Sequence, residues 1–229
     1  SDNLNYPYGT KSEEEVIKCV DGTIAKIMSL HKPDIIVVAC NTASTVALPF
    51  LRDKYPVQFV GVVPAIKPAA ALTQTKVIGL LATPGTVKRK YIDELIAKYA
   101  SDCEIIRIGS RLLVDIAEKM IWGLKPNQKD IDHELVAFHT TKTDVIVLGC
   151  THFKLVDKYL KQALPNVPHF IDSSASIAKR VATLLQDEPK SVQNPVGQGL
   201  CLFSADPGNV AAVQQYLKSF GNFPISQLS

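Results

Sequence analysis

Short apolar runs alternate with longer amphipathic segments along most of the chain. Runs rich in β-branched residues predict strands at 34–39, 58–63, 76–81, 104–108, 144–148, 169–171 and 200–204. Apolar residues spaced three and four apart predict helices at 12–30, 45–54, 87–99, 114–121, 129–140, 154–164 and 176–185, with a last helix at the C-terminus. Strands that alternate with helices indicate an α/β fold that is doubly wound, with mainly parallel sheets.

The chain carries one pattern twice. "IIVVACNT" at 35–42 and "VIVLGCTH" at 145–152 each end an apolar strand in a small residue, a Cys and two polar residues. Three pairs of positions keep one offset of 110, since 150 − 40, 144 − 34 and 174 − 64 agree: Cys40 with Cys150, Asp34 with Asp144, and Pro64 with Ser174. This repetition predicts two homologous, pseudo-symmetric domains. We assign residues 1–66 and 178–229 to the first and 67–177 to the second, with the active site in the cleft between them.

The same offset predicts elements of the first domain that precede Ser1. The strand and Thr-rich loop that end at Thr83 would have their counterpart at position −27, because 83 − 110 = −27. We therefore expect a strand, a helix and a strand upstream of this sequence. If they were lacking from the molecule, exposed sheet edges would result.

Charge and hydropathy exclude several classes of protein. The 229 residues hold 25 Lys and Arg against 22 Asp and Glu, a net charge of +3, and the basic residues are scattered, so no nucleic-acid partner is expected. No apolar run reaches the roughly 18 to 20 residues of a membrane helix, and the first residues do not form a signal peptide. We expect a soluble, cytoplasmic protein.

The cysteines are odd in number and form no C-x-x-C motif. This indicates free thiols, with neither disulfides nor a metal site. We expect Cys19, Cys103 and Cys201 to be small buried hydrophobic residues without a chemical role. Cys40 and Cys150 differ because each stands where a predicted parallel strand ends and a helix begins, the edge at which such sheets bind ligands. A helix N-terminus favours a thiolate, so we expect a lowered pKa at these positions.

A ligand between two such edges would meet one thiol on each face. One thiolate could remove a proton from a tetrahedral carbon while the opposite thiol returns a proton from the other side. The product would have inverted stereochemistry. Two opposed cysteines therefore predict a racemase or epimerase that needs no metal and no organic cofactor.

Polar residues that could bind a carboxylate surround the two cysteines. They are Asn41, Thr42, Thr83, Thr86, Thr151 and His152. Helix capping explains Asn41, Thr42 and Thr151 equally well, and His152 could be structural, although its place two residues from Cys150 favours a role in proton transfer.

Other chemistries fit less well. A Cys–His hydrolase would need only one Cys, and no phosphate-binding glycine motif is present for a nucleotide. Nothing nominates a Schiff-base lysine for pyridoxal chemistry.

Five motifs resemble those of the glutamate racemase family, in the aspartate/glutamate racemase superfamily. They are "YPYGTKSE" at 6–13, "VVACNTASTVALP" at 37–49, "VGVVPAIKPAA" at 60–70, "GLLATPGTVKR" at 79–89 and "VLGCTHF" at 147–153. The resemblance implies a cofactor-independent isomerase that supplies D-glutamate for bacterial peptidoglycan, and hence for cell-wall biogenesis and cell shape.

The resemblance also implies roles for individual residues. Cys40 would be the base acting on D-glutamate and Cys150 the base acting on L-glutamate, with His152 assisting Cys150 and Glu118 orienting His152. The carboxylates and amino group of the substrate would be held by Pro7, Tyr8, Gly9, Asn41, Thr42, Thr83, Thr86 and Thr151.

The sequence departs from the family's pattern in two places. The family's N-terminal strand and its F-D-S-G-V-G-G loop, which carries an Asp beside the first Cys, are not in this sequence, and prolines are more usual around Arg111 and Asp115. The main alternative is therefore a catalytically impaired or dead binding protein of the same fold. A one-Cys decarboxylase or a hydantoin racemase of the superfamily is disfavoured by the two complete Cys motifs. A homodimer and a peptidoglycan-precursor activator are left open as partners.

Overall fold

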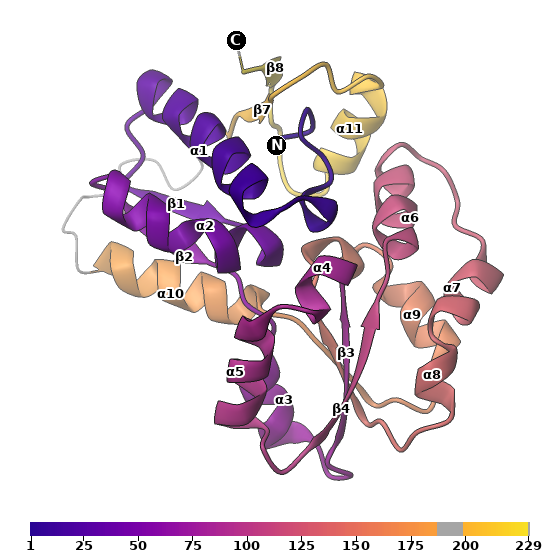
Figure 1. Cartoon of the computed structure of the whole chain (residues 1–229). Coiled ribbons are helices and arrows are strands. Elements are labelled where there is room, and N and C mark those ends of the chain that lie inside the picture. The colour runs from indigo at the N-terminus through magenta and orange to yellow at the C-terminus, as the bar shows by residue number, and fades with distance from the viewer. Residues whose placement is uncertain (187–198, 229) are drawn as a thin grey trace.

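The computed structural model describes residues 1–186 and 199–228 and forms an α/β protein with three parallel sheets (Figure 1). The largest sheet has the order β4-β3-β5-β6, from β3 (Val77–Ala82), β4 (Glu104–Gly109), β5 (Val145–Leu148) and β6 (His169–Ile171). β1 (Ile35–Val38) pairs with β2 (Gln58–Gly61), and β7 (Cys201–Phe203) pairs with β8 (Ile225–Gln227). Every strand pair is parallel, which confirms the predicted fold class.

Helices pack around these sheets. They are α1 (Glu13–Leu30), α2 (Asn41–Lys54), α3 (Ile66–Leu72), α4 (Pro84–Val87), α5 (Lys90–Tyr99), α6 (Leu112–Ile121), α7 (Gln128–Glu134), α8 (Val136–His139), α9 (Asp157–Ala163), α10 (Ser174–Gln186) and α11 (Val210–Leu217). Short 3₁₀ turns are η1 (Tyr8–Thr10) and η2 (Thr151–Lys154). α1 and α2 cover the β1–β2 sheet, while α6 to α9 lie on one side of the largest sheet and α3 and α5 on the other (Figure 1).

The start of α1 shows how local chemistry sets an element. Ser12 accepts a hydrogen bond from the backbone of Glu15, and the Glu15 carboxylate accepts one from the backbone of Ser12, which is a complete capping box. Val16, Val20 and Ile24 recur at helical spacing and are buried against the sheet. The helix predicted for residues 12–30 is confirmed.

Buried apolar residues form three clusters. One lies between α1, α2 and the β1–β2 sheet, and the other two lie on the opposite faces of the largest sheet. All four residues of β5 are buried, as expected for a strand that has neighbours on both edges and helices on both faces.

Several predicted helix bounds were wrong. α2 begins at Asn41, directly after Cys40, because the polar residues before Thr45 form its first turn. The helix predicted at 129–140 is divided into α7 and α8, and the helix predicted at 154–164 begins only at Asp157, as α9, after the separate turn η2. α3 and β8 were not predicted. α3 was missed because it contains Pro68, and proline usually argues against a helix. In the first turn, however, a Pro removes no helical hydrogen bond, so the helix forms.

The strand register brings the site residues to one edge. Leu81 of β3 lies beside Leu148 of β5, and the backbone N–H of Gly149 donates to the Leu81 carbonyl at 2.7 Å. Parallel strands end on the same edge, so Thr83 and Cys150 leave the sheet next to each other.

Candidate active site

A cavity of about 850 Å³ lies at the carboxyl ends of the strands from two sheets. Cys40 follows β1 and Cys150 follows β5, and both line this cavity. The chain thus brings two thiols 110 positions apart (150 − 40) into one space.

Cys40 is the residue that precedes α2, with an extended backbone at φ −143° and ψ 123°. Burial raises the pKa of the Cys40 thiol. The backbone N–H groups of Ala43 and Thr42 act in the opposite direction, and negative charge at Cys150 raises the pKa further. The lowered pKa expected at this helix start is therefore wrong for Cys40, because the loss of hydration outweighs the N–H groups of the helix. The Cys40 thiol is protonated at neutral pH.

Cys150 has a charged partner. It is 8% exposed, and its Sγ lies 3.8 Å from Nδ1 of His152. His152 Nε2 lies 2.6 Å from Oε1 of Glu118, which comes from α6. Burial lowers the pKa of His152, but the hydrogen bonds and negative charges of Cys150 and Glu118 outweigh it and raise the pKa to about 10. The imidazole of His152 thus lies beside Cys150 with a raised pKa, which favours its charged form.

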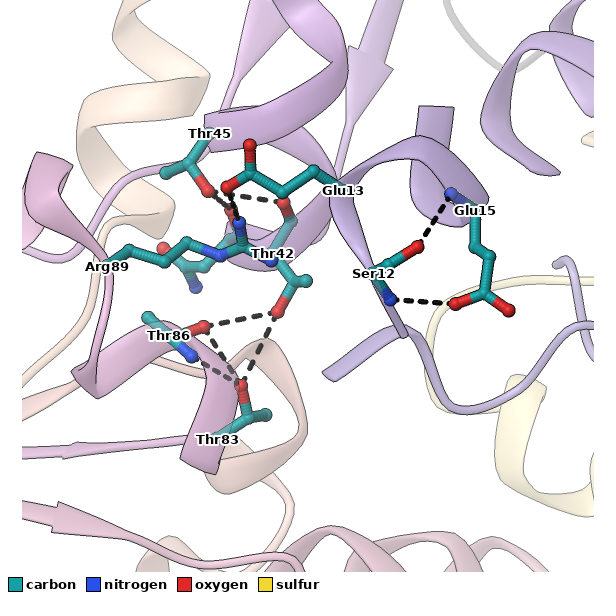
Figure 2. Close-up of polar contacts among 9 residues, drawn as sticks. Ser12, Glu13, Glu15, Thr42, Thr45, Thr83, Thr86 and Arg89 are labelled. Carbon is teal, nitrogen blue, oxygen red and sulfur yellow. Dashed lines mark hydrogen bonds and ion pairs between the residues drawn. The ribbon is translucent and has the colours of Figure 1, made fainter. Parts of the chain in front are cut away.

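Three threonine hydroxyls meet next to the cavity (Figure 2). Thr42 Oγ1 lies 3.1 Å from Thr86 Oγ1 and 3.4 Å from Thr83 Oγ1, and the last two are 2.9 Å apart. Thr42 and Thr83 line the cavity, whereas Thr86 is fully buried behind them. Thr86 therefore supports the other two hydroxyls and does not face the cavity.

Asn41 offers an acceptor to a bound molecule. Its side chain lines the cavity and is 4% exposed, yet its Oδ1 has no hydrogen-bond partner among the described residues. A buried amide oxygen without a partner is costly, which favours a ligand that donates a hydrogen bond here. An amino group is one such donor.

The remaining predicted residues also line the cavity. Pro7, Tyr8 and Gly9 form one wall, and Thr151 lies beside Cys150. The Tyr8 hydroxyl donates to the carboxylate of Asp2, and the Thr151 hydroxyl donates to the Ala39 carbonyl at 3.2 Å. A Cβ at Gly9 would lie only 3.0 Å from Cβ of Thr83, so this wall packs tightly against Thr83.

Sequence reasoning missed a group of aromatic residues that line the cavity. The Tyr6 hydroxyl donates to Asp115 Oδ1 at 3.0 Å, and the Tyr6 ring lies 6.2 Å from the His152 ring. Trp122, directly after α6, and Tyr216, within α11, also line the cavity. These residues share no local motif, and contacts between such distant positions leave no signal in a single sequence.

Among residues 1–186 and 199–228, no cluster of three or more His, Cys, Asp or Glu side chains could hold a metal ion. Within the same residues, no helix has the length and apolar character to cross a bilayer.

Fold and site together define a parallel α/β protein with paired thiols, one from each of two strand–helix junctions, in one cavity. The sequence model of Asp/Glu/hydantoin racemases matches residues 1–181, so the chain belongs to that family of isomerases. The resemblance drawn from its motifs is confirmed.

Relatives and solved structures agree with this membership. The glutamate racemase of Glaesserella parasuis is 43% identical over 221 residues, which cover 96% of this chain and 83% of the relative. That of Actinobacillus pleuropneumoniae is 49% identical over 187 residues, or 81% of this chain and 71% of the relative. The crystal structure of Escherichia coli glutamate racemase, in complex with L-glutamate and the activator UDP-MurNAc-Ala, superposes with a TM-score of 0.92 at 39% identity. It covers 100% of this chain and 86% of the E. coli chain.

Proposed function

We propose that this protein interconverts L-glutamate and D-glutamate by a two-cysteine mechanism. The observation that carries the proposal is that Cys40 and Cys150 line one cavity from the ends of strands in two different sheets. The glutamate racemases among its relatives support glutamate as the substrate.

The proposed chemistry consists of two proton transfers. With L-glutamate, the Cys150 thiolate removes the α-proton, and the Cys40 thiol donates its proton to the opposite face of the carbanion. The product is D-glutamate, with Cys150 protonated and Cys40 a thiolate, ready for the reverse direction. Protons and charge balance, and we propose that the reaction uses neither a metal nor an organic cofactor.

The resting charges suit the first of these directions. The raised pKa of Cys40 favours its protonated thiol, while the imidazolium of His152 lies next to the Cys150 sulfur, where it would attract the charge of a reacting thiolate. The Glu118 carboxylate holds the His152 ring in place through Nε2. Glu118 is thus a positioning residue for His152, and His152 for the reactive sulfur.

The polar groups of the cavity would hold the substrate. Asn41 Oδ1 would accept from the α-amino group, because it has no partner within the described residues. The hydroxyls of Thr42 and Thr83 would donate to a carboxylate, with Thr86 behind them. Thr151 and the wall formed by Pro7, Tyr8 and Gly9 would complete the contacts.

The proposed domain division follows the two sheets that supply the cysteines. Residues 1–66 with 178–229 contain β1 and Cys40, and residues 67–177 contain β5 and Cys150. Residues 187–198 and 229, which fall in the first domain, lie outside the described residues.

Two single substitutions test the mechanism. Cys40→Ala and Cys150→Ala should each abolish racemisation, measured as the loss of circular dichroism of L-glutamate, while Cys103→Ala should leave it unchanged. A single variant should retain exchange of the α-proton with D₂O for one enantiomer only. If both single variants still racemised glutamate at the unsubstituted rate, the two-base mechanism would be refuted.

The wider role proposed is the supply of D-glutamate for peptidoglycan in the bacterial cytoplasm. A peptidoglycan precursor is a proposed activator, since the E. coli relative was crystallised with UDP-MurNAc-Ala. A homodimer stays a prediction. The alternative, a binding protein without turnover, would give glutamate binding by calorimetry with no change in circular dichroism.

A further inference from the structure

The segment after α4 carries a charged side chain that the mechanism does not use. Arg89 does not line the cavity, yet its side chain is only 13% exposed, and its Nε is buried with no partner among the described residues. Its Nη1 donates to the carboxylate of Glu13, the first residue of α1. Figure 2 shows this pair beside the cluster of Thr42, Thr83 and Thr86.

This ion pair joins the two proposed domains. Glu13 belongs to the first and Arg89 to the second, whereas the other ion pairs in the described part of the chain each lie within one domain. The threonine cluster is divided in the same way, with Thr42 in the first domain and Thr83 and Thr86 in the second.

Arg89 is coupled to the cluster through its backbone. Its N–H donates to the Thr86 carbonyl at 3.2 Å, while its side chain holds α1. Glu13 is itself fixed, because the capping box formed by Ser12 and Glu15 on either side of it sets the first turn of α1. Arg89 thus links Thr86, through its backbone, to α1 of the first domain, through its side chain.

The two domains also touch closely at α4, next to Thr86. α4 packs against η1 and α2, and a Cβ on Gly85 would lie 2.6 Å from the Gly9 carbonyl oxygen. A rotation that separated the domains would break this contact, the Thr42–Thr86 hydrogen bond and the Arg89–Glu13 pair together. The Arg89–Glu13 ion pair and these contacts therefore belong to the same inter-domain interface.

We propose that Arg89 is a positioning residue that, through Glu13, holds the domains in the closed arrangement and so keeps Thr42 and Thr83 at the spacing a carboxylate requires. Its loss should weaken substrate binding more than the proton transfers, because bound substrate itself restores the closed arrangement, so the cost of closing appears mainly in KM. The kinetic consequence rests on the proposed function. The structural consequence, easier opening of the cavity, does not.

Glu13→Gln is the main test variant, and the chain offers a matched control. Asp93 also stands in the first turn of a helix and pairs with an arginine, Arg107, at 2.7 Å, but within the second domain. The side-chain exposures are similar, 71% for Glu13 and 58% for Asp93. Asp93→Asn therefore also removes a largely exposed helix-start carboxylate from an arginine, but breaks no inter-domain pair. Arg89→Met and the double variant with Glu13→Gln complete a double-mutant cycle.

The first measurement needs no turnover. Peptide-resolved labelling by iodoacetamide gives the alkylation rates of Cys40 and Cys150 relative to Cys103, which does not line the cavity. In Glu13→Gln both relative rates should rise by about two- to fivefold, the range that loss of a partly exposed ion pair allows. They should not change in Asp93→Asn, and 0.5 M salt, roughly three times the physiological ionic strength, should move the unsubstituted protein toward the Glu13→Gln values.

The second measurement separates binding from chemistry. The KM for glutamate should rise by about two- to fivefold in Glu13→Gln and Arg89→Met, with kcat changed by less than about twofold, and the double variant should add little. Equal labelling rates in Glu13→Gln and Asp93→Asn would overturn the proposal. If the unsubstituted chain failed to racemise glutamate, the proposed function would fall, and the labelling result would still decide the role of Arg89.

Discussion

Glu118 and His152 form a 2.6 Å contact between α6 and the residue two positions after Cys150. Both side chains are about one-third exposed or less, so water screens the pair only in part. This contact helps to raise the pKa of His152 to about 10, which favours an imidazolium next to one of the two thiols, and the first predictions concern it.

Removal of the carboxylate at position 118 should weaken that charge. In Glu118→Gln the pKa of His152 should fall, since the amide supplies no negative charge, and kcat should drop by about 10²-fold, the scale of general acid–base assistance. An NMR titration of the imidazole and steady-state racemisation measure the two effects. Glu94→Gln, which removes an exposed carboxylate paired with Lys90, is the control. An unchanged His152 titration in Glu118→Gln would contradict the role given to Glu118.

Stability should depend on pH through the same histidine. Its pKa in the folded state is about 10, above the value of 6.5 for an unperturbed histidine, so protonation favours the folded state. This contribution is fully present below pH 6.5 and is lost as the pH rises through about 10. The difference between 6.5 and about 10 corresponds to at most about 5 kcal/mol, since one pKa unit is about 1.4 kcal/mol.

Denaturant unfolding between pH 6 and 10.5 checks this prediction. The free energy of unfolding of the unsubstituted protein should decline across this window, and that of His152→Gln should decline less. Parallel curves for the two proteins would show that His152 is not the group responsible.

The contact between Gly85 and Gly9 should not tolerate a side chain. In Gly85→Ala the new Cβ would lie 2.6 Å from the backbone oxygen of Gly9, so α4 and η1 must separate, and the free energy of unfolding should fall by about 1–3 kcal/mol. Gly22→Ala is a matched control within α1, where a new Cβ meets no atom within 4 Å. It should stabilise the protein by about 0.5–1 kcal/mol. Thermal unfolding of both variants tests the difference in sign.

Thr86 should matter although it does not face the cavity. Thr86→Val keeps the side-chain shape but removes the hydroxyl that lies 3.1 Å from Thr42 and 2.9 Å from Thr83. Stability should fall by about 1 kcal/mol, the net value of a buried hydrogen bond, and the KM for glutamate should rise. Thr23→Val, which removes a hydroxyl that donates only to the Cys19 carbonyl of its own helix, should leave KM unchanged.

Local patterns were sufficient for the main elements of the fold. The run from Ile35 to Val38 and the run from Val145 to Leu148 formed strands as predicted, because β-branched residues pack well on a pleated, buried surface. The predicted helix bounds were less accurate. α7 and α8 are separated at Leu135, which is buried in the core, and the spacing of apolar residues does not reveal this break.

The cysteines could be nominated from sequence because they repeat at one offset and each follows a strand. The protonation state of Cys40 could not be predicted from sequence. A helix N-terminus predicts a lowered pKa for Cys40, but the dehydrated surroundings created by packing reverse the shift. Resemblance to a family nominated Glu118, and no spacing rule links it to His152, 34 residues away.

The sequence by itself determined the alternation of strands and helices, the two thiols at strand ends and the membership of a racemase family, since each depends on residues adjacent in the chain. Only the tertiary structure decided that Thr86 lies behind the cavity, that Tyr6 reaches Asp115 and that Arg89 reaches Glu13. These contacts join residues that the register of the sheets and the packing of helices bring together, and neither is encoded in any short stretch of sequence.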